Sequence, residues 1–247
     1  MKIGVLGCFF NCERDLDKVL SPWINLRESK NLVLTAVNSV FKENAELGMS
    51  VDDDKTRLKI ANSRLDYHYF SPVPLTESQA RNKCLDYLLY TGVDFVWILD
   101  GDEFYSEKQI SEVIYFLEKN KENRGCFFSI PFKNHVFDGV EWVDGFCPPR
   151  VFNNNIHDGI DQFYWDNDIL YKDGTNYKAL AEMKVPKDVA HVRHMTWLHE
   201  NGKEKYEYQV KHFGQCSYKW SYEEEKLEFD KEYHEKHGIP IPKLEIG

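Results

Sequence analysis

The sequence predicts an α/β protein with a mostly parallel central sheet flanked by helices. Ile3–Phe10 and Leu32–Val40 are short apolar runs with a helical pattern between them, and this strand-helix-strand order starts a parallel sheet. A third run, Phe95–Leu99, is apolar without a break. Such a run is typical of a strand that is buried on both faces.

The segments after the first strand follow the same alternation. Asn11 is a candidate cap for the first helix, and Pro22 either kinks or ends that helix. Four apolar residues share one helical face: Leu16, Val19, Leu20 and Trp23. Residues 42–62, with Asp52–Asp54 in the middle, are polar, and we interpret them as solvated loop or helix surface.

Further elements are predicted from local signals. Leu65–Phe70 and Cys126–Val136 are predicted strands. Capping boxes at Thr76–Gln79 and Ser106–Gln109 open helices that run to about residues 90 and 120. Ser221-x-x-Glu224 is predicted to cap a charged helix to about residue 237, which would make a C-terminal helical extension.

Composition limits the class of protein. With 247 residues, the chain is one large domain or one domain with an appendage. A net charge of −10 argues against broad nucleic-acid binding, which needs a basic face. The six cysteines are scattered without a Cys-x-x-Cys pair, so we expect reduced core thiols and a cytoplasmic protein. No apolar run approaches the ~20 residues of a membrane span.

Three acids follow the Phe95–Leu99 run. Asp100 and Asp102 are two apart, so both carboxylates project to the same side of an extended backbone. Gly101 between them allows a tight turn and the close approach of a ligand. Ligands of open α/β sheets bind at the carboxyl edge, and two hard oxygens suit Mg²⁺ or Mn²⁺ with the phosphates of a substrate.

Three segments resemble one enzyme family. Ile98–Phe104 resembles the Asp-x-Asp segment of family 2-type glycosyltransferases with the GT-A fold, which hold a nucleotide-sugar through a divalent metal. Gln79–Asn82 resembles their Ala-Arg-Asn segment, and Pro148–Phe152 resembles their Pro-Arg-Leu-Phe segment. The resemblance implies a GT-A (Rossmann-like) domain over 1–215, with a nucleotide-binding half at 1–125 and an acceptor-binding half at 126–215, and a C-terminal helix and tail at 216–247.

The resemblance also implies a donor site. Its metal would be held by Asp102 and His194, with His191 as the alternate, and a histidine ligand favours Mn²⁺ over Mg²⁺. Glu103 would orient Asp102, and Arg150 would meet either a phosphate or an acid in the core. The residues expected at the donor nucleotide are Phe10, Asn11, Asn38, Arg81, Asp100, Gly101 and Lys205. The family often has an Asp where this chain has Asn38-Ser39.

The acceptor side is less defined. Residues 153–190 mix aromatic rings with amides and acids, a composition that suits carbohydrate. Most family members invert the transferred sugar, which requires a carboxylate to take the proton of the acceptor hydroxyl. Asp144, Asp158 and Asp161 are the candidates, and the sequence does not choose among them.

Other functions stay open at this stage. A metal-dependent nucleotidyltransferase usually has a glycine-rich phosphate loop, and Gly4 and Gly7 are too sparse for one. A non-catalytic carbohydrate-binding or assembly protein would share the fold without turnover. A glycosyltransferase acting on a modified DNA base would show a salt-dependent affinity for DNA, which the acidic charge disfavours.

Overall fold

The structure is a computed structural model that forms two compact units. One unit joins Met1–Pro131 with Cys147–Val192, and the other joins Phe132–Phe146 with Arg193–Gly247. The residues described are 1–46, 53–120, 126–137, 140–143, 147–165, 168–190, 192–194, 206–207, 210, 218–221, 226–229, 232, 235–236 and 243–244.

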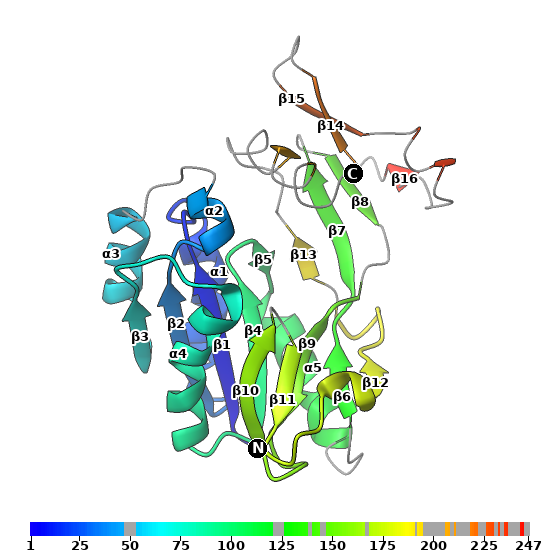
Figure 1. Cartoon of the computed structure of the whole chain (residues 1–247). Helices are drawn as coiled ribbons and strands as arrows, with labels where there is room; N and C mark the ends of the chain where they lie inside the picture. The colour runs from blue at the N-terminus through cyan, green and yellow to red at the C-terminus, as the bar shows by residue number, and fades with distance from the viewer. Residues whose placement is uncertain are drawn as a thin grey trace. The chain divides into compact units, whose positions relative to one another are not determined.

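The first unit is built on a seven-stranded sheet in the order β12-β6-β9-β4-β1-β2-β3 (Figure 1). Its strands are β1 (Ile3–Phe9), β2 (Leu32–Asn38), β3 (Tyr67–Phe70), β4 (Phe95–Asp100), β6 (Cys126–Ser129), β9 (Pro149–Asn153) and β12 (Ala181–Lys184). Neighbouring strands are parallel, except that β9 is antiparallel to both β4 and β6. The predicted mostly parallel α/β sheet is confirmed.

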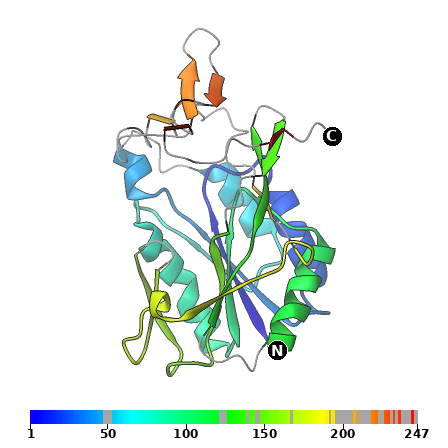
Figure 2. The same cartoon turned by 90° about the vertical axis from the view of Figure 1, so that its right-hand side faces the viewer.

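Helices cover both faces of this sheet. Helix α4 (Glu77–Tyr90) lies on one face beside the hairpin of β10 (Ile160–Trp165) and β11 (Asp168–Tyr171), as Figure 1 shows. Helices α1 (Leu16–Leu26) and α5 (Glu107–Asn120) lie on the opposite face (Figure 2). The remaining helical elements of this unit are α2 (Lys42–Glu46), α3 (Asp54–Asn62) and the short η1 (Tyr177–Ala179).

The two faces bury different cores. On the α4 face, Cys84 and Leu88 pack with Ile98 of β4 and Phe163 of β10 in one apolar cluster. On the other face, the rings of Trp23, Trp97 and Tyr105 meet edge to face, with 4.8 Å between the two tryptophan centroids. All seven residues of β1 and all seven of β2 are buried, as expected for strands with helices on both sides.

The strand order creates a switch point between β1 and β4. The chain steps outward from β1 through β2 to β3, then returns through α4 to β4 on the other side of β1. The pairing sets Cys8 opposite Asp100, and Phe9 opposite Asn38. Asp100 and Asn38 therefore end their strands at the same carboxyl edge, where ligands of open α/β sheets bind.

Several local predictions need correction. Asn11 does not cap the first helix, because α1 begins at Leu16 with Asp15 at its N-cap. Pro22 lies inside α1 and does not end it. The predicted strand 126–136 is divided into β6 and β7 (Phe132–Phe137), because Pro131 cannot donate to a ladder. Residues 54–62 form α3, whose Thr56 and Ile60 are buried, so the interpretation of this segment as solvated is wrong there.

The second unit contains short antiparallel strands. Strand β8 (Val140–Val143) pairs with β7 and with β16 (Lys243–Leu244), and β14 (Tyr218–Ser221) pairs with β15 (Lys226–Phe229). The predicted helix from Ser221 is therefore wrong over 226–229. Apolar and polar residues alternate along both strands of this hairpin, so that Trp220 faces Leu227, and this period of two outweighs the helical charge spacing. Among the described residues, the strands not yet named are β5 (Glu103–Phe104) and β13 (Val192–His194).

Candidate functional site

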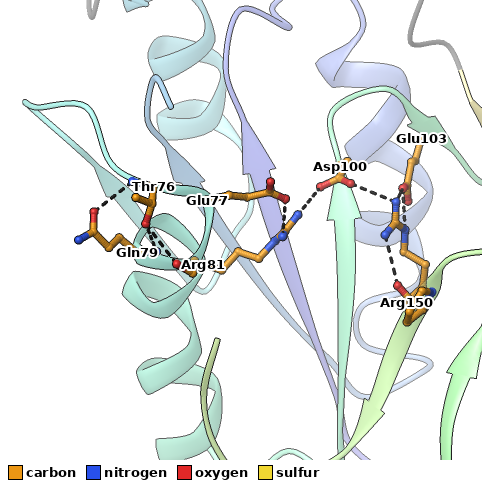
Figure 3. Close-up of polar contacts among 9 residues, drawn as sticks. Thr76, Glu77, Gln79, Arg81, Asp100, Glu103 and Arg150 are labelled. Carbon is orange, nitrogen blue, oxygen red and sulfur yellow. Dashed lines mark hydrogen bonds and ion pairs between the residues drawn. The ribbon is translucent and has the colours of Figure 1, made fainter. Parts of the chain in front are cut away.

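Asp100 ends β4 between two buried arginines (Figure 3). Nη2 of Arg81 donates to Oδ1 of Asp100, and Nη2 of Arg150 donates to Oδ2, both at 3.1 Å. The two arginines are 1% and 4% exposed, whereas 28% of the Asp100 side chain is exposed. Asp100 is thus fixed by charge from both sides and still reaches the surface of the edge.

The start of α4 positions Arg81. The side chains of Thr76 and Gln79 form the predicted capping box, which fixes the first turn of the helix. Arg81 then lies one turn after Glu77 and forms an ion pair with it as well as with Asp100. An arginine in the first turn of a helix usually pairs with its neighbour at an exposed position. Arg81 does pair with Glu77, but its guanidinium is buried in the core.

Arg150 meets acids in the core. Its Nε donates to Oε1 of Glu103 at 2.7 Å, and its Nη2 lies 2.5 Å from the same oxygen. Glu103 is fully buried and also accepts a hydrogen bond from the Tyr105 hydroxyl. Burial raises the pKa of the Glu103 carboxyl to about 8, against the opposing charge of Arg150 and with a further rise from Asp100 and Asp102.

Asp102 lies in the turn after β4 and is half-buried. Gly101, beside it, has no positive φ, so the freedom of glycine is not needed for the turn. Space is needed instead, because a Cβ at position 101 would lie 3.2 Å from Sγ of Cys12. The close neighbour of this glycine is therefore the loop between β1 and α1.

A second polar group lies at the end of β2. The Nδ2 of Asn38 donates to the carbonyl of Phe9 at 2.9 Å and to Oδ2 of Asp53 at 2.8 Å. Its Oδ1 accepts from Nε of Arg57 at 2.8 Å. Asn38 is fully buried, and both of its amide hydrogens are used inside the protein. Neither amide hydrogen of Asn38 is therefore left over for a ligand.

Sequence reasoning missed Asp53 and Arg57 of this group. Asp53 is 5% exposed and caps α3 by accepting from the amide of Thr56. Phe10, half-buried, and Asn11, exposed, follow β1 beside it. The signal available was local: Asp53 stands three residues before Thr56 at the start of a helical stretch, which is N-cap spacing inside the charged run.

Asn82 carries the other half of the Ala-Arg-Asn segment. Its Nδ2 donates to the carbonyl of Phe163 at 2.7 Å, and its Oδ1 accepts from the amide of Phe163 at 2.8 Å. The Phe163 ring lies 5.9 Å from the guanidinium carbon of Arg81. The segment thus joins α4 to β4 through Arg81 and to β10 through Asn82.

The candidate base residues are not gathered at Asp100. Asp158 lies in the turn after β9, and Asn154 of that turn donates to the carbonyl of Asp94 at the opposite, amino edge of the sheet. Asp161 is exposed near the start of β10, two residues before Phe163. Asp144, His191 and Lys205 lie outside the described residues. For His194 the backbone in β13 is described and the side chain is not.

The described residues contain neither a ready-made metal cluster nor a membrane-spanning helix. Within these ranges, no three side chains of His, Cys, Asp or Glu come together as a metal site. Over the same ranges, every helix is too short or too polar to span a bilayer.

Comparison with known proteins identifies the fold. No protein-family model and no curated protein matches the sequence. The crystal structure of S. aureus TarS, a family 2 glycosyltransferase, is similar over 85% of this chain and 39% of the TarS chain, with a TM-score of 0.50 and 13% identity. The chain therefore has a GT-A-like fold, and it spans less than half the length of TarS.

Two structures of TarS 1–349 are similar over a smaller share of this chain. The complex with UDP is similar over 55% of this chain and 36% of that chain, with a TM-score of 0.40 and 15% identity. The complex with UDP-GlcNAc is similar over 55% of this chain and 35% of that chain, with a TM-score of 0.40 and 16% identity.

Proposed function

We propose that this chain is a glycosyltransferase that moves a sugar from a nucleoside-diphosphate donor to an acceptor hydroxyl. The observation that carries the proposal is the fixed acid at the switch point. Asp100 ends β4 between Arg81 and Arg150, and Asp102 follows it at the same edge of a GT-A-like sheet. This is where an open α/β sheet receives its ligand.

The charges around Asp100 fit a divalent cation. Arg81 and Arg150 contribute two positive charges, and four acids lie in contact with them or beside them: Glu77, Asp100, Asp102 and Glu103. With Glu103 protonated at neutral pH, as its raised pKa of about 8 implies, the sum is one negative charge; with every group ionised it is two. We propose that Asp102 holds Mn²⁺ or Mg²⁺ together with the phosphates of the donor, with His194 or His191 as a further ligand.

The metal would supply charge neutralisation for the departing diphosphate. Asp102 would hold the pyrophosphate end of the donor through that charge. Asp100 would accept a hydrogen bond from the donor ribose or from a metal-bound water, since each carboxylate oxygen accepts one hydrogen bond from an arginine and can accept another. Arg81 and Arg150 hold the Asp100 carboxylate in a fixed position through these two hydrogen bonds.

We propose that the sugar is transferred to the acceptor hydroxyl with inversion at its anomeric carbon. The acceptor hydroxyl must lose its proton to a carboxylate within hydrogen-bond reach. Asp144 stays as a candidate for this base, whereas Asp158 and Asp161 lie close to Ile160, whose amide donates to Asn154 in the turn at the amino edge of the sheet.

Donor turnover tests the proposal. The protein is incubated with UDP-, GDP-, CDP- and dTDP-sugars and Mn²⁺, starting with UDP-GlcNAc because TarS has been crystallised with it, and released nucleoside diphosphate is measured. We expect one nucleotide to be released, and we expect EDTA and the substitution Asp102→Ala to stop the release. Binding of carbohydrate without release of any nucleotide would favour a non-catalytic binding protein instead.

A further inference from the structure

The loop between β1 and α1 is held by side chains of α3. The amide of Asn11 donates to Oδ2 of Asp53 at 2.7 Å, and the next amide, of Cys12, donates to Oγ1 of Thr56 at 3.2 Å. Two successive backbone donors of one loop thus end on the first turn of a helix more than forty residues further along the chain, since the two pairs are separated by 42 and 44 positions.

Both acceptors are buried and well fixed. Asp53 is 5% exposed and Thr56 is fully buried. Oδ2 of Asp53 also accepts from Asn38, whose other amide hydrogen goes to the carbonyl of Phe9. One carboxylate oxygen therefore joins the end of β1, the end of β2 and the loop that follows β1.

Arg57 extends this arrangement to the next strand. Its Nε donates to Asn38, and its Nη2 donates at 2.9 Å to the carbonyl of Ser71, which follows β3. The first turn of α3 thus ties together the carboxyl ends of three parallel strands. A helix that only covered the sheet would need apolar contacts and none of these polar ones.

The loop depends on these contacts for its conformation. Asn11 has a φ of 54°, a left-handed backbone that residues with side chains rarely adopt, and its side chain is exposed. Cys12, next to it, packs against Gly101 in the turn that carries Asp102. A change in the hold of Asp53 and Thr56 on the loop would therefore alter the surface on one side of the proposed donor site.

We propose that Asp53 and Thr56 are positioning residues for the nucleoside end of the donor. They fix Phe10 and Asn11 in the conformation that receives the base and ribose, while the diphosphate end depends on Asp102. This inference rests on the proposed function. It assigns a role to the charged run at 53–57 that does not require these side chains to touch the donor.

Binding of two probes separates the two ends of the donor. The first probe is the nucleoside diphosphate, among UDP, GDP, CDP and dTDP, that the wild type binds with Mn²⁺, and the second is inorganic pyrophosphate with Mn²⁺. For Asp53→Asn we expect the nucleotide Kd to rise about tenfold, as it would if the loop were competent a tenth of the time, and the pyrophosphate Kd to stay within about twofold.

Thr56→Val tests the second contact without a change of shape. It removes the acceptor for the Cys12 amide and keeps the volume of the side chain, and we expect the nucleotide Kd to rise about threefold, because fewer molecules hold the competent loop. Asp54→Asn is the matched control, since Asp54 is the exposed acid next to Asp53 and carries the same charge. We expect it to leave both affinities unchanged.

Melting temperatures are measured in parallel, and binding is measured at least ~15 °C below them so that every variant is folded. The inference would be overturned if Asp53→Asn and Thr56→Val lowered the melting temperature but bound the nucleotide like wild type. It would also be overturned if they lost affinity for nucleotide and for pyrophosphate equally. If the wild type binds pyrophosphate but no nucleotide, or neither probe, the proposed function fails and this inference with it. If the nucleotide Kd is unchanged in both variants, this inference fails and the proposed function stands.

Discussion

Two polar groups at the same sheet edge are built on different principles. The arginine cluster (Glu77, Arg81, Asp100, Glu103 and Arg150) pairs two buried guanidinium groups with acids at the end of β4. The amide cluster (Asn11, Asn38, Asp53 and Arg57) gathers amide donors and one guanidinium around the ends of β1 and β2.

The difference shows what each cluster holds in place. In the arginine cluster, side chains fix a side chain, because both oxygens of Asp100 are bound by guanidinium groups. In the amide cluster, side chains fix the backbone. Asp53 accepts a hydrogen bond from the amide of Asn11, and Asn38 donates one to the carbonyl of Phe9. We infer that the first serves the charged end of a ligand and the second the shape of a loop.

Loss of Arg150 should have the largest effect on stability. Arg150→Met leaves Glu103 fully buried without its cation and removes one partner of Asp100, so we expect the free energy of unfolding to fall by about 3–5 kcal/mol. Urea unfolding measures the change. Lys108→Met is the control, because Lys108 forms an exposed pair with Glu112 on α5 and its loss should not be measurable. Equal effects would mean that the arginine cluster contributes no more than a surface pair.

The amide cluster should reject a second acid. In Asn38→Asp, a carboxylate oxygen replaces the Nδ2 that now lies 2.8 Å from Oδ2 of Asp53, and the hydrogen bond to Phe9 is lost. We expect a loss of about 2–3 kcal/mol in the free energy of unfolding at neutral pH. Asn25→Asp is matched, because Asn25 donates to Glu107 in the same way at an exposed position. If Asn38→Asp left the free energy of unfolding unchanged, Asp53 would not be a carboxylate in contact with position 38.

Stability should depend on pH through Glu103. Burial raises the pKa of this carboxyl from its ordinary value of 4.5 to about 8 in the folded protein, so the folded state binds the proton more tightly than the unfolded state. The resulting stabilisation is complete below about pH 4.5 and is lost as the pH rises through 8, by at most about 1.4 kcal/mol per pH unit. Urea unfolding from pH 5 to 8.5 should give a steeper decline for wild type than for Glu103→Gln. Parallel curves would contradict the assignment.

The smallest expected effect concerns the contact between Gly101, next to Asp100 of the arginine cluster, and Cys12, next to Asn11 of the amide cluster. In Gly101→Ala the new Cβ lies 3.2 Å from Sγ of Cys12, so the neighbour must shift, and we expect a loss of about 1 kcal/mol. Cys12→Ala should relieve part of that loss in the double variant, because it removes Sγ and keeps the Cβ that would lie 3.3 Å away. Gly92→Ala is the control: it has a φ of 70° and nothing within 4 Å, so its cost comes from the backbone and Cys12→Ala should not change it.

The arginine cluster could largely be predicted from the sequence. The Phe95–Leu99 run placed Asp100 at a strand end. The capping box placed Arg81 near the start of the helix that precedes this strand. That Arg150 binds Glu103 was one of two alternatives, because sequence does not tell a core acid from a phosphate. The mostly parallel sheet was also predictable, since apolar runs alternate with helical patterns.

The amide cluster could not be predicted. Asn38 and Asp53 are 15 positions apart, and their contact depends on how α3 returns to the sheet after β2. A run of charged residues is usually solvated, and here burial of one of them reverses that expectation. At the C-terminal hairpin, helical charge spacing and strand alternation coexisted in one segment, and only the pairing of β14 with β15 decides between them.

Calorimetric titration of UDP, GDP, CDP and dTDP, with and without Mn²⁺, tests the central claim most directly. It is performed on wild type and on Asp102→Ala, with thermal melting to verify that both are folded. We expect one nucleotide to bind wild type in the presence of Mn²⁺, and we expect both removal of the metal and Asp102→Ala to abolish that binding. Failure of every nucleotide to bind under every condition would contradict the account of this edge as a donor site.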